Sequence, residues 1–386
     1  MNIKDAKQSR IAWLFPSLAL GNYWHPILAE FTRIFPQTTV FTGNWPGFAS
    51  GFENTFSIKV VGKMTFIDLA RSQMGYSQGF IKASPAIVKE LVRFKPKIIF
   101  TSGFSIWTIF SILLKPVFGW QVIIVYDGSS PGVDYRNSKV RTTMRRIIAY
   151  FANAFITNSR AGKAYLTEFL SIKSERVFAR PYQVPEPKAL ELQTKPVELD
   201  FSQLQQPIFF FTGQIIPRKG LEQLLQACKI LKNRGNTNYT LLIAGDGEQK
   251  CQLEAFCQTE GIEERVRWLG WVDYGQLGTY LRHVDVFILP TLEDVWGMVV
   301  LEAMAFGKPI LCSQLAGAAE MIVDGENGFL FNPQKPQKIA RLMEQFIEHP
   351  QLIDSLGAKS RQSIAQYTPK TAVQFLTKVQ SFVLDR

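Results

Sequence analysis

Short apolar runs alternate with helical patterns along most of this 386-residue chain. In the first half, runs that are apolar throughout predict parallel strands covered by helices on both faces. They are Ile11–Phe15, Ile98–Thr101, Val122–Tyr126 and Phe155–Thr157. Helical spacing of apolar residues falls between them, near His25–Ile34, Gly79–Phe94 and Val140–Phe151. This is the βαβ pattern of a doubly wound α/β domain.

A stretch with five prolines, 181–207, separates this set from a second one. The strands expected in the second set are Ile208–Phe211, Tyr239–Ala244, Val266–Leu269, Val286–Leu289 and Pro309–Cys312, and the tail from about Lys335 reads as helical. We therefore predict an α/β protein with two doubly wound, Rossmann-like domains, 1–185 and 207–368, that face a cleft. A linker over 186–206 would join them, and a C-terminal helix over 369–386 could cross back to the first domain.

Cysteine and histidine usage excludes several classes of protein. The four cysteines form no C-x-x-C pair, and three histidines are too few for a histidine-rich metal centre. We expect a reduced, cytoplasmic chain without a metal, and the polar start MNIKDAKQSR predicts no signal peptide. The most apolar window, Ile98–Leu114, carries no charge and is shorter than the roughly 20 residues of a spanning helix, so it predicts a buried strand and a core helix.

The net charge of +11 belongs to the first half of the chain. Residues 1–200 hold 25 Lys and Arg against 13 Asp and Glu, whereas residues 201–386 hold 18 against 19. Such asymmetry indicates an anionic partner, either a membrane surface or nucleic acid. No nucleic-acid-binding motif is present.

One segment concentrates this charge. Between Arg136 and Ala152, cations stand at Arg136, Lys139, Arg141, Arg145 and Arg146, and apolar residues with helical spacing stand at Val140, Met144, Ile147, Ile148 and Phe151. The pattern predicts an amphipathic helix that packs its apolar side inward and turns its basic side to an anionic membrane. A solvated basic face is the alternative.

Arg218 and Lys219 open the apolar helical pattern of RKGLEQLLQA, directly after a predicted strand. Cations at a helix N-terminus oppose the helix dipole, whereas phosphates bind there. A bound diphosphate would make the pair favourable. The alternative is two solvated surface residues.

Glu302 is the only charge in the predicted helix Gly297–Phe306, which is apolar on every face. Such a helix is buried, and a buried carboxylate needs a partner. Ribose hydroxyls could donate to it, and an internal salt bridge is the alternative. Asp294, eight residues earlier, reads alone as an N-cap, but together the two carboxylates could converge on one ligand.

Two glycine stretches give weaker signals. Gly245 and Gly247 follow a predicted strand and permit a tight turn. Gly21 follows the first strand and could let the backbone approach a phosphate, although a simple turn is as good an explanation.

These motifs occur together in a recognisable order. FTGQIIPRKGLEQLLQA, LLIAGDGE, VRWLGWV, DVFILPTLEDVWGMVVLEAMAFGKPIL and AGAAEMIVDGENGFLF resemble the GT-B glycosyltransferases of family 4, which transfer a sugar from a nucleotide-sugar with retention of configuration. The resemblance is specific from about Phe209 to Asn332 and only topological before that.

The resemblance implies a role for each matching residue. Lys219, helped by Arg218, would neutralise the donor diphosphate; Glu302 would bind the ribose; and Asp294 stands where the family usually has a glutamate on the donor sugar. Further donor contacts would come from Gly21, Gly213, Gly245, Val272, Val295, Trp296, Gly297 and Met298. No metal is required, because the two cations take that role.

Two positions depart from the family pattern. Gln214 replaces the usual arginine after the glycine, so Arg218 could supply the missing charge. The usual histidine before an aspartate is Tyr126 in the stretch Tyr126-Asp127-Gly128, which makes Asp127 the polar candidate on the acceptor side.

The expected function is therefore transfer of a hexose to a hydroxyl acceptor, either a membrane lipid or a lipid-linked glycan. A soluble saccharide acceptor, a nucleotide-sugar epimerase or phosphorylase-like reaction, and nucleic-acid binding remain as alternatives.

Overall fold

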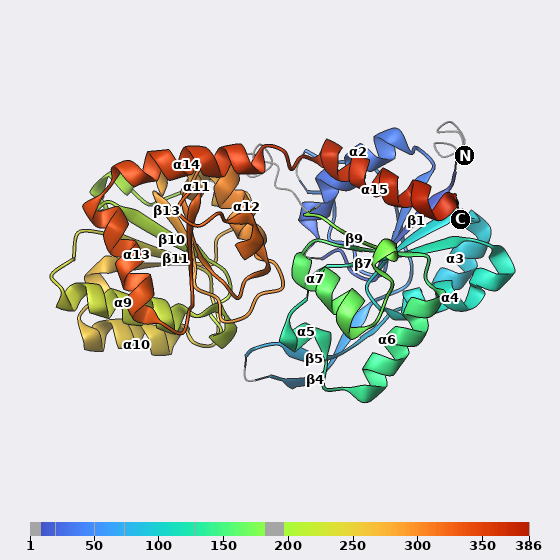
Figure 1. Cartoon of the computed structure of the whole chain (residues 1–386), viewed down its shortest axis with the longest axis horizontal. Coiled ribbons are helices and arrows are strands. Elements are labelled where there is room, and N and C mark those ends of the chain that lie inside the picture. Colours follow the sequence, from blue (N-terminus) through green and yellow to red (C-terminus); the bar gives the residue numbers. More distant parts are fainter. Residues whose placement is uncertain are drawn as a thin grey trace. The chain divides into compact units, whose positions relative to one another are not determined.

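The computed structural model describes residues 9–19, 21–49, 51–72, 74–127, 129–181 and 197–385, with only the backbone described for residues 22, 70, 71, 77 and 78. The chain divides into two compact units (Figure 1). The first contains Met1–Ser72, Tyr76–Val184 and Tyr367–Arg386, and the second contains Gln73–Gly75 and Pro185–Gln366. Most of the expected linker lies outside the described residues.

A seven-stranded parallel sheet forms the centre of the first unit, in the order β3-β2-β1-β6-β7-β8-β9. Its strands are β1 (Ile11–Phe15), β2 (Thr38–Thr42), β3 (Ser57–Val60), β6 (Ile98–Ser102), β7 (Gln121–Tyr126), β8 (Ala154–Thr157) and β9 (Val177–Ala179). The four strands predicted in this half are present, within one residue at each end. They are buried because helices cover both faces of the sheet, as the continuous apolar runs require.

The helices of the first unit lie on two sides of this sheet. They are η1 (Asn22–Trp24), α2 (His25–Ile34), α3 (Ile87–Phe94), α4 (Ile106–Phe118), α5 (Pro131–Asp134), α6 (Lys139–Phe151), α7 (Arg160–Ala164), η2 (Tyr165–Phe169), η3 (Ser174–Arg176) and α15 (Pro369–Leu384). One apolar core joins the sheet to α2 and α15, and a second core joins its other face to α3, α4, α6 and η2.

The helix predicted over Gly79–Phe94 is wrong in its first part. Residues Thr65–Arg71 (β4) and Ser77–Lys82 (β5) form an antiparallel hairpin, and α3 begins only at Ile87. Helical spacing was misleading there because period-2 and period-3.6 patterns overlap in short segments.

The second unit has a six-stranded parallel sheet in the order β12-β11-β10-β13-β14-β15. Its strands are β10 (Ile208–Thr212), β11 (Thr240–Ala244), β12 (Val266–Gly270), β13 (Val286–Leu289), β14 (Ile310–Ser313) and β15 (Gly328–Phe331). Its helices are η4 (Phe201–Gln203), η5 (Pro217–Lys219), α9 (Leu221–Asn233), α10 (Lys250–Glu260), η6 (Glu263–Arg265), α11 (Leu277–His283), α12 (Met298–Ala305), η7 (Gly317–Met321), α13 (Pro336–Glu348) and α14 (Gln351–Ile364). The predicted α/β class with two doubly wound domains is confirmed.

Each sheet has one place where the strand order reverses. In the first unit the chain moves outward from β1 in one direction and from β6 in the other, and in the second unit the reversal lies between β10 and β13. Ligands of open α/β sheets bind beyond the carboxyl ends of the strands at such a switch point. The loops after β1, β10 and β13 are therefore the places to look for a site.

No described helix is long and apolar enough to cross a membrane. The uncharged run Ile98–Leu114 forms β6 and most of α4, as expected. The four cysteines are free, and only Cys251 is exposed.

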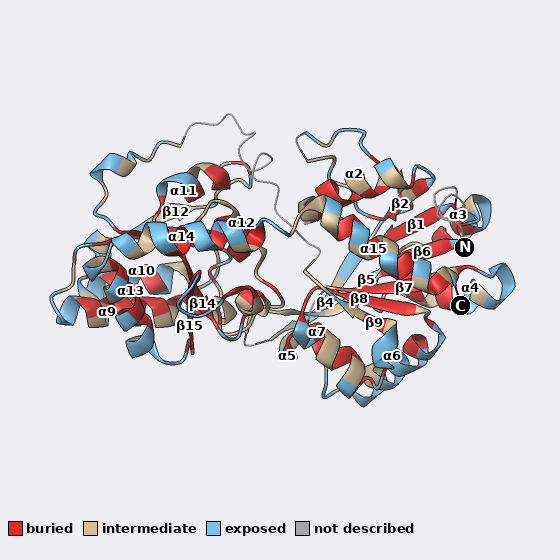
Figure 2. Cartoon of the chain, turned by 45° about the horizontal axis from the view of Figure 1, so that its top comes forward, coloured by how far each residue is buried: buried red, intermediate tan, exposed pale blue. Residues whose placement is uncertain are grey.

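The C-terminal helix α15 is part of the first unit. It packs against α2 and buries Val373, Leu376 and Val379 completely. Figure 2 colours α15 by burial. Thr368 and Thr371 form a capping box that fixes where the helix begins. The last residues of the chain thus complete the core of the domain in which the chain starts.

Replacing Leu376 by alanine tests this packing. A buried leucine lost to alanine costs about 2–5 kcal/mol of unfolding free energy, so Leu376→Ala should lower the stability of the first unit. Gln374→Ala, on the exposed side of the same helix, is the matched control. Equal chemical denaturation curves for the two variants would show that α15 does not stabilise the unit.

Candidate active site

An ion pair lies at the switch point of the second sheet. Lys219 follows β10 and Asp294 follows β13, and Lys219 Nζ lies 2.5 Å from Asp294 Oδ2. Both side chains are largely buried, with exposures of 14% and 12%. The structure therefore brings together two of the residues predicted for the site, although they are 75 positions apart in the sequence.

The loops that carry this pair are joined through their backbones. Gly220 has a left-handed φ of +69°, and a Cβ there would meet the Pro290 carbonyl oxygen at 2.0 Å. Thr291 Oγ1 and the Leu292 amide both donate to the Arg218 carbonyl at 2.7 Å. Only glycine fits at position 220, and the contact sets the spacing of the two charged side chains.

The sequence predicted Arg218 and Lys219 in the first turn of α9, but they do not lie there. They belong to the short 3-10 turn η5, and α9 begins after Gly220, at Leu221. The reason is the left-handed backbone of Gly220, which a continuous right-handed helix cannot contain. The Arg218 guanidinium lies 3.4 Å from Gln214 Oε1. Arg218 is thus a neighbour of the position where the family usually has an arginine and this chain has Gln214.

Gly213 and Gly245 bring a third loop to the same place. A Cβ at Gly245 would meet the Gly213 carbonyl oxygen at 1.9 Å, and one at Gly213 would lie 3.8 Å from Lys219 Cε. Both glycines have positive φ, at +154° and +144°. The ends of β10 and β11 thus pack backbone to backbone beside the lysine.

The loop from Asp294 to Gly297 is held by residues that follow β14. Asp294 forms a parallel bridge with Ala316, and the Ala318 amide donates to the Trp296 carbonyl at 2.7 Å. A Cβ at Gly317 would meet the Val295 carbonyl oxygen at 2.3 Å. This support fixes the backbone that is expected to face the donor.

The N-terminus of α12 follows this loop directly. The residue before its first turn is Gly297, with φ +99°, and no side chain caps the helix. The alternative in which Asp294 is the N-cap is therefore wrong, because Gly297 occupies that position. The Met298 and Val299 amides open the helix, and the Val300 amide donates to the Gly297 carbonyl at 3.0 Å.

Glu302 is buried in α12 and accepts a hydrogen bond from Tyr274 Oη at 2.9 Å. Burial raises the pKa of Glu302 to about 7, and the tyrosine hydroxyl partly opposes that rise. Among the described residues, Glu302 forms no ion pair with Lys or Arg, so the salt-bridge alternative is wrong. A hydroxyl already occupies the place where a ribose hydroxyl is expected.

Tyr274 is a candidate that the sequence analysis missed. It lies in the loop after β12, two residues beyond the predicted donor contact Val272, which is half-buried. Burial and the Glu302 carboxylate both raise the pKa of Tyr274. A tyrosine at the carboxyl end of a predicted strand was the available signal.

In the first unit, two predicted residues lie at the carboxyl ends of strands. Gly21 follows β1 and Asp127 follows β7, while Gly128 lies outside the described residues. Burial and the charge of the Asp127 carboxylate both raise the pKa of Tyr23. Tyr23 was also missed, although it stands two residues after Gly21.

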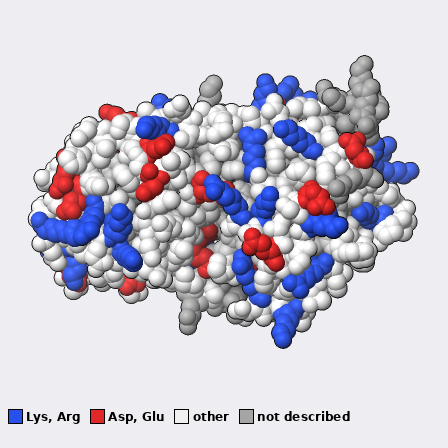
Figure 3. All heavy atoms as spheres, viewed as in Figure 1, with Lys and Arg blue, Asp and Glu red and all other residues white. Residues whose placement is uncertain are grey.

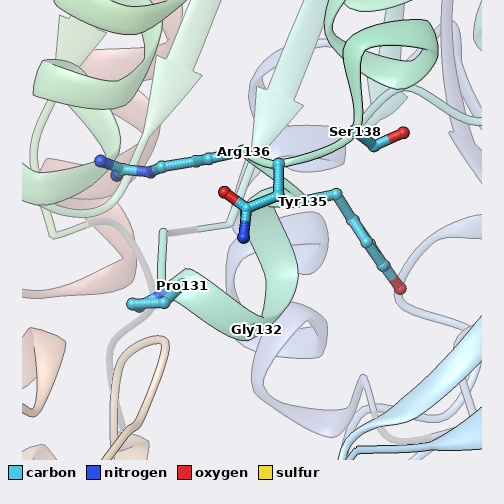
Figure 4. A pocket seen from close by; sticks show the side chains of 6 residues that line it. Pro131, Gly132, Tyr135, Arg136 and Ser138 are labelled. Atoms are coloured by element: carbon cyan, nitrogen blue, oxygen red, sulfur yellow. The ribbon is translucent and has the colours of Figure 1, made fainter.

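A pocket of about 480 Å³ opens beside α5 in this unit, lined by Pro131, Gly132, Tyr135, Arg136, Asn137 and Ser138. Figure 4 shows the side chains of Tyr135 and Arg136 pointing in opposite directions from the turn between α5 and α6. Asp134, directly before them, is buried and accepts from Tyr126 Oη at 2.6 Å and from Arg136 Nη2 at 2.8 Å.

The predicted orientation of α6 is wrong. Arg145 donates to the Asp134 carbonyl at 2.7 Å and to Tyr165 Oη at 2.6 Å, and Arg141 lies 3.8 Å above the Tyr135 ring. These arginines turn toward the protein because buried oxygens need donors. Arg146 binds the Phe169 carbonyl and Lys139 is exposed at the first turn of α6.

The apolar side chains of α6 are correspondingly turned outward. Of the five that were expected to pack inward, only Ile148 is buried, whereas Val140, Met144, Ile147 and Phe151 are 49% to 72% exposed. The helix is amphipathic, but Arg141 and Arg145 face the unit while most of its apolar side chains are exposed.

No group of three or more His, Cys, Asp or Glu side chains within the described ranges is placed to hold a metal ion.

The raised pKa of Glu302 gives a test of its burial. The native state binds this proton more tightly than the unfolded chain, so the stabilisation is complete below about pH 4.5 and is lost as the pH rises toward 7. Glu302→Gln should therefore become more stable relative to the wild type across that range, as measured by urea unfolding. Glu326→Gln, at an exposed position, is the control, and identical pH profiles for all three proteins would show that Glu302 is ionised in the fold.

Comparison with known proteins identifies the second unit. Residues 200–371 match the family model described as Glycosyl transferases group 1. An uncharacterized glycosyltransferase of Methanocaldococcus jannaschii is 34% identical over 133 residues, which are 34% of each chain. The lipopolysaccharide core biosynthesis glycosyltransferase LpsE of Rhizobium meliloti is 28% identical over 167 residues, covering 43% of this chain and 47% of that protein. The matches thus span only about a third to a half of these curated relatives.

Solved structures resemble the whole chain. HepE of Anabaena, crystallised in complex with UDP and glucose, has a TM-score of 0.73 at 18% identity over 97% of this chain and 100% of its own. Sucrose-phosphate synthase of Thermosynechococcus elongatus has a TM-score of 0.73 at 18% identity over 98% and 100%. The chain thus has the GT-B fold, and its residues 200–371 match the glycosyl transferases group 1 family model.

Proposed function

We propose that this protein transfers a hexose from a nucleotide-diphosphate sugar to a hydroxyl group of a membrane lipid or lipid-linked glycan, with retention of configuration. The observation that carries the proposal is the largely buried Lys219–Asp294 pair at the switch point of the second sheet. Solved relatives of the fold crystallised with UDP and with UDP-glucose support a nucleotide-sugar donor.

The diphosphate would bind where Lys219 now meets Asp294. Charge builds on this leaving group as the glycosidic bond breaks, and fixed cations and helix-end amides stabilise such charge. Lys219 and Arg218 would supply the cations, and the backbone amides at the start of α12 would supply the dipoles. We propose that this charge removes the need for a metal.

The ribose would bind at Glu302. Its hydroxyls would replace Tyr274 Oη as donors to the carboxylate, so one buried hydrogen bond is exchanged for another. Asp294, released by Lys219, would contact the donor sugar. The acceptor hydroxyl would attack on the face that the diphosphate leaves, and a diphosphate oxygen would take its proton.

The acceptor would bind to the first unit. Asp127 is the polar group after β7, and the pocket beside α5 offers an aromatic ring, an amide and a guanidinium for a polar acceptor. The excess of cations in residues 1–200 supports a peripheral position on the inner face of an anionic membrane. The Rhizobium relative, named for lipopolysaccharide core biosynthesis, supports a lipid-linked acceptor.

Lys219→Ala should weaken nucleoside diphosphate binding. The loss of a charged hydrogen-bond partner costs about 1.5–3 kcal/mol, or roughly tenfold to a hundredfold in affinity. Isothermal titration with a panel of nucleoside diphosphates measures this effect. Lys229→Ala, which removes an exposed cation paired with Glu260, is the matched control. Equal affinities for the two variants would contradict the assignment of Lys219.

Asp127→Asn should act on the acceptor side alone. We expect kcat/KM for the acceptor to fall by about tenfold or more, because a charged hydrogen-bonding group is lost, while donor affinity stays unchanged. Mass spectrometry of lipid and saccharide products formed with several nucleotide-sugars identifies the acceptor, with Glu168→Gln as the exposed control. Formation of an isomerised donor or a sugar phosphate, without transfer, would favour the epimerase or phosphorylase-like alternative.

A further inference from the structure

Eight exposed apolar side chains lie on two neighbouring helices of the first unit, and we call them the α4–α6 apolar face. They are Leu113, Val117 and Phe118 of α4 and Val140, Met144, Ile147, Tyr150 and Phe151 of α6, with exposures from 42% to 77%. The helices contact each other, and Lys115 Nζ donates to the Phe151 carbonyl at 2.8 Å. Helical spacing places the residues of each helix on one side.

Both helices already pack against the sheet through their other sides. Trp107 and Ile112 of α4 and Ile148 of α6 are buried in the core of the first unit. The arginines at 141 and 145 also point inward, toward Tyr135 and Asp134. Each helix therefore has one apolar side in the core and another that is exposed. A surface helix normally turns a polar side to water.

The charges of these helices favour an anionic occupant. Neither helix contains Asp or Glu, and together they carry one lysine in α4 and four cations in α6. Lys139 and Arg146 are exposed beside the apolar residues. Figure 3 shows Lys and Arg gathered over the first unit on the visible face. A second copy of the chain would bring the same positive charge to the contact, which disfavours self-association.

The hairpin β4–β5 next to α6 also exposes apolar side chains. Phe66, Leu69, Phe80 and Ile81 are exposed on it. Arg141 Nη2 lies 3.4 Å from the Gly79 carbonyl, so the hairpin sits beside α6. Aromatic residues such as Phe118, Tyr150 and Phe80 are typical of the boundary between acyl chains and headgroups.

We propose that the α4–α6 apolar face inserts into the interfacial layer of an anionic lipid bilayer, with Lys139 and Arg146 on the headgroups. This inference deepens the lipid-acceptor part of the proposed function and rests on it. Insertion would hold the acceptor-binding unit at the membrane surface that contains the acceptor. The sequence analysis expected the basic side of α6 to face the membrane, whereas here the exposed apolar side chains make the main contact. Binding should then keep a component that salt does not screen.

Co-sedimentation with phosphatidylcholine vesicles, with and without phosphatidylglycerol, at low and high salt, tests the proposal. We expect strong binding to anionic vesicles that is reduced but not abolished at high salt. The variant Leu113→Gln, Val117→Gln, Ile147→Gln should bind at least tenfold more weakly in both salts. Its matched control is Leu315→Gln, Val323→Gln, which changes exposed apolar residues of the second unit and should bind as the wild type does.

Three outcomes would overturn the proposal. These are undiminished binding by the triple variant, complete loss of wild-type binding at high salt, and a dimer in light scattering that the triple variant loses, which would make the face a contact between copies. The single variant Val117→Gln replaces the triple variant if the latter unfolds. Nucleoside diphosphate affinity is measured in parallel: a triple variant with normal affinity and lost vesicle binding separates this surface from the donor site. Failure of all sugar transfer with vesicle binding intact would overturn the proposed function alone.

Discussion

The ion pair between Lys219 and Asp294 organises the second unit. Two charges held mostly away from water are stable only with each other or with a ligand, because desolvating either one alone is costly. The loops that carry them are locked by the close approach of Gly220 to Pro290 and by the hydrogen bonds to the Arg218 carbonyl. The pair thus stands on rigid backbone at the switch point, where a diphosphate can take the place of one partner.

Much of this arrangement could be predicted from the sequence. Continuous apolar runs gave the strands, because only a sheet covered on both faces is apolar at every position. Glycines and charged residues directly after those strands were predicted to form the site, and Gly213, Gly245 and Lys219 do lie close together. Carboxyl ends of parallel strands meet at one edge, so residues far apart in sequence can be assigned to one place.

The errors have physical causes. Periodicity shows that α6 has two sides, but not which of them faces the protein. The buried oxygens of Asp134 and Tyr165, 11 and 20 positions from Arg145, decide that. The start of α9 depends on the φ of Gly220, which depends in turn on Pro290. The fold brings Tyr274 to Glu302, and the sequence around neither residue predicts this contact.

The central claim is that the pair opens for the diphosphate, and the affinity of Asp294→Asn for a nucleoside diphosphate without a sugar tests it most directly. Removing the carboxylate frees Lys219 and removes a negative charge beside the phosphates. Calorimetry should therefore show tighter binding than in the wild type, even though sugar transfer is lost. Weaker binding in a fully folded variant would contradict the claim, because it would mean that the diphosphate does not take the place of Asp294 at Lys219.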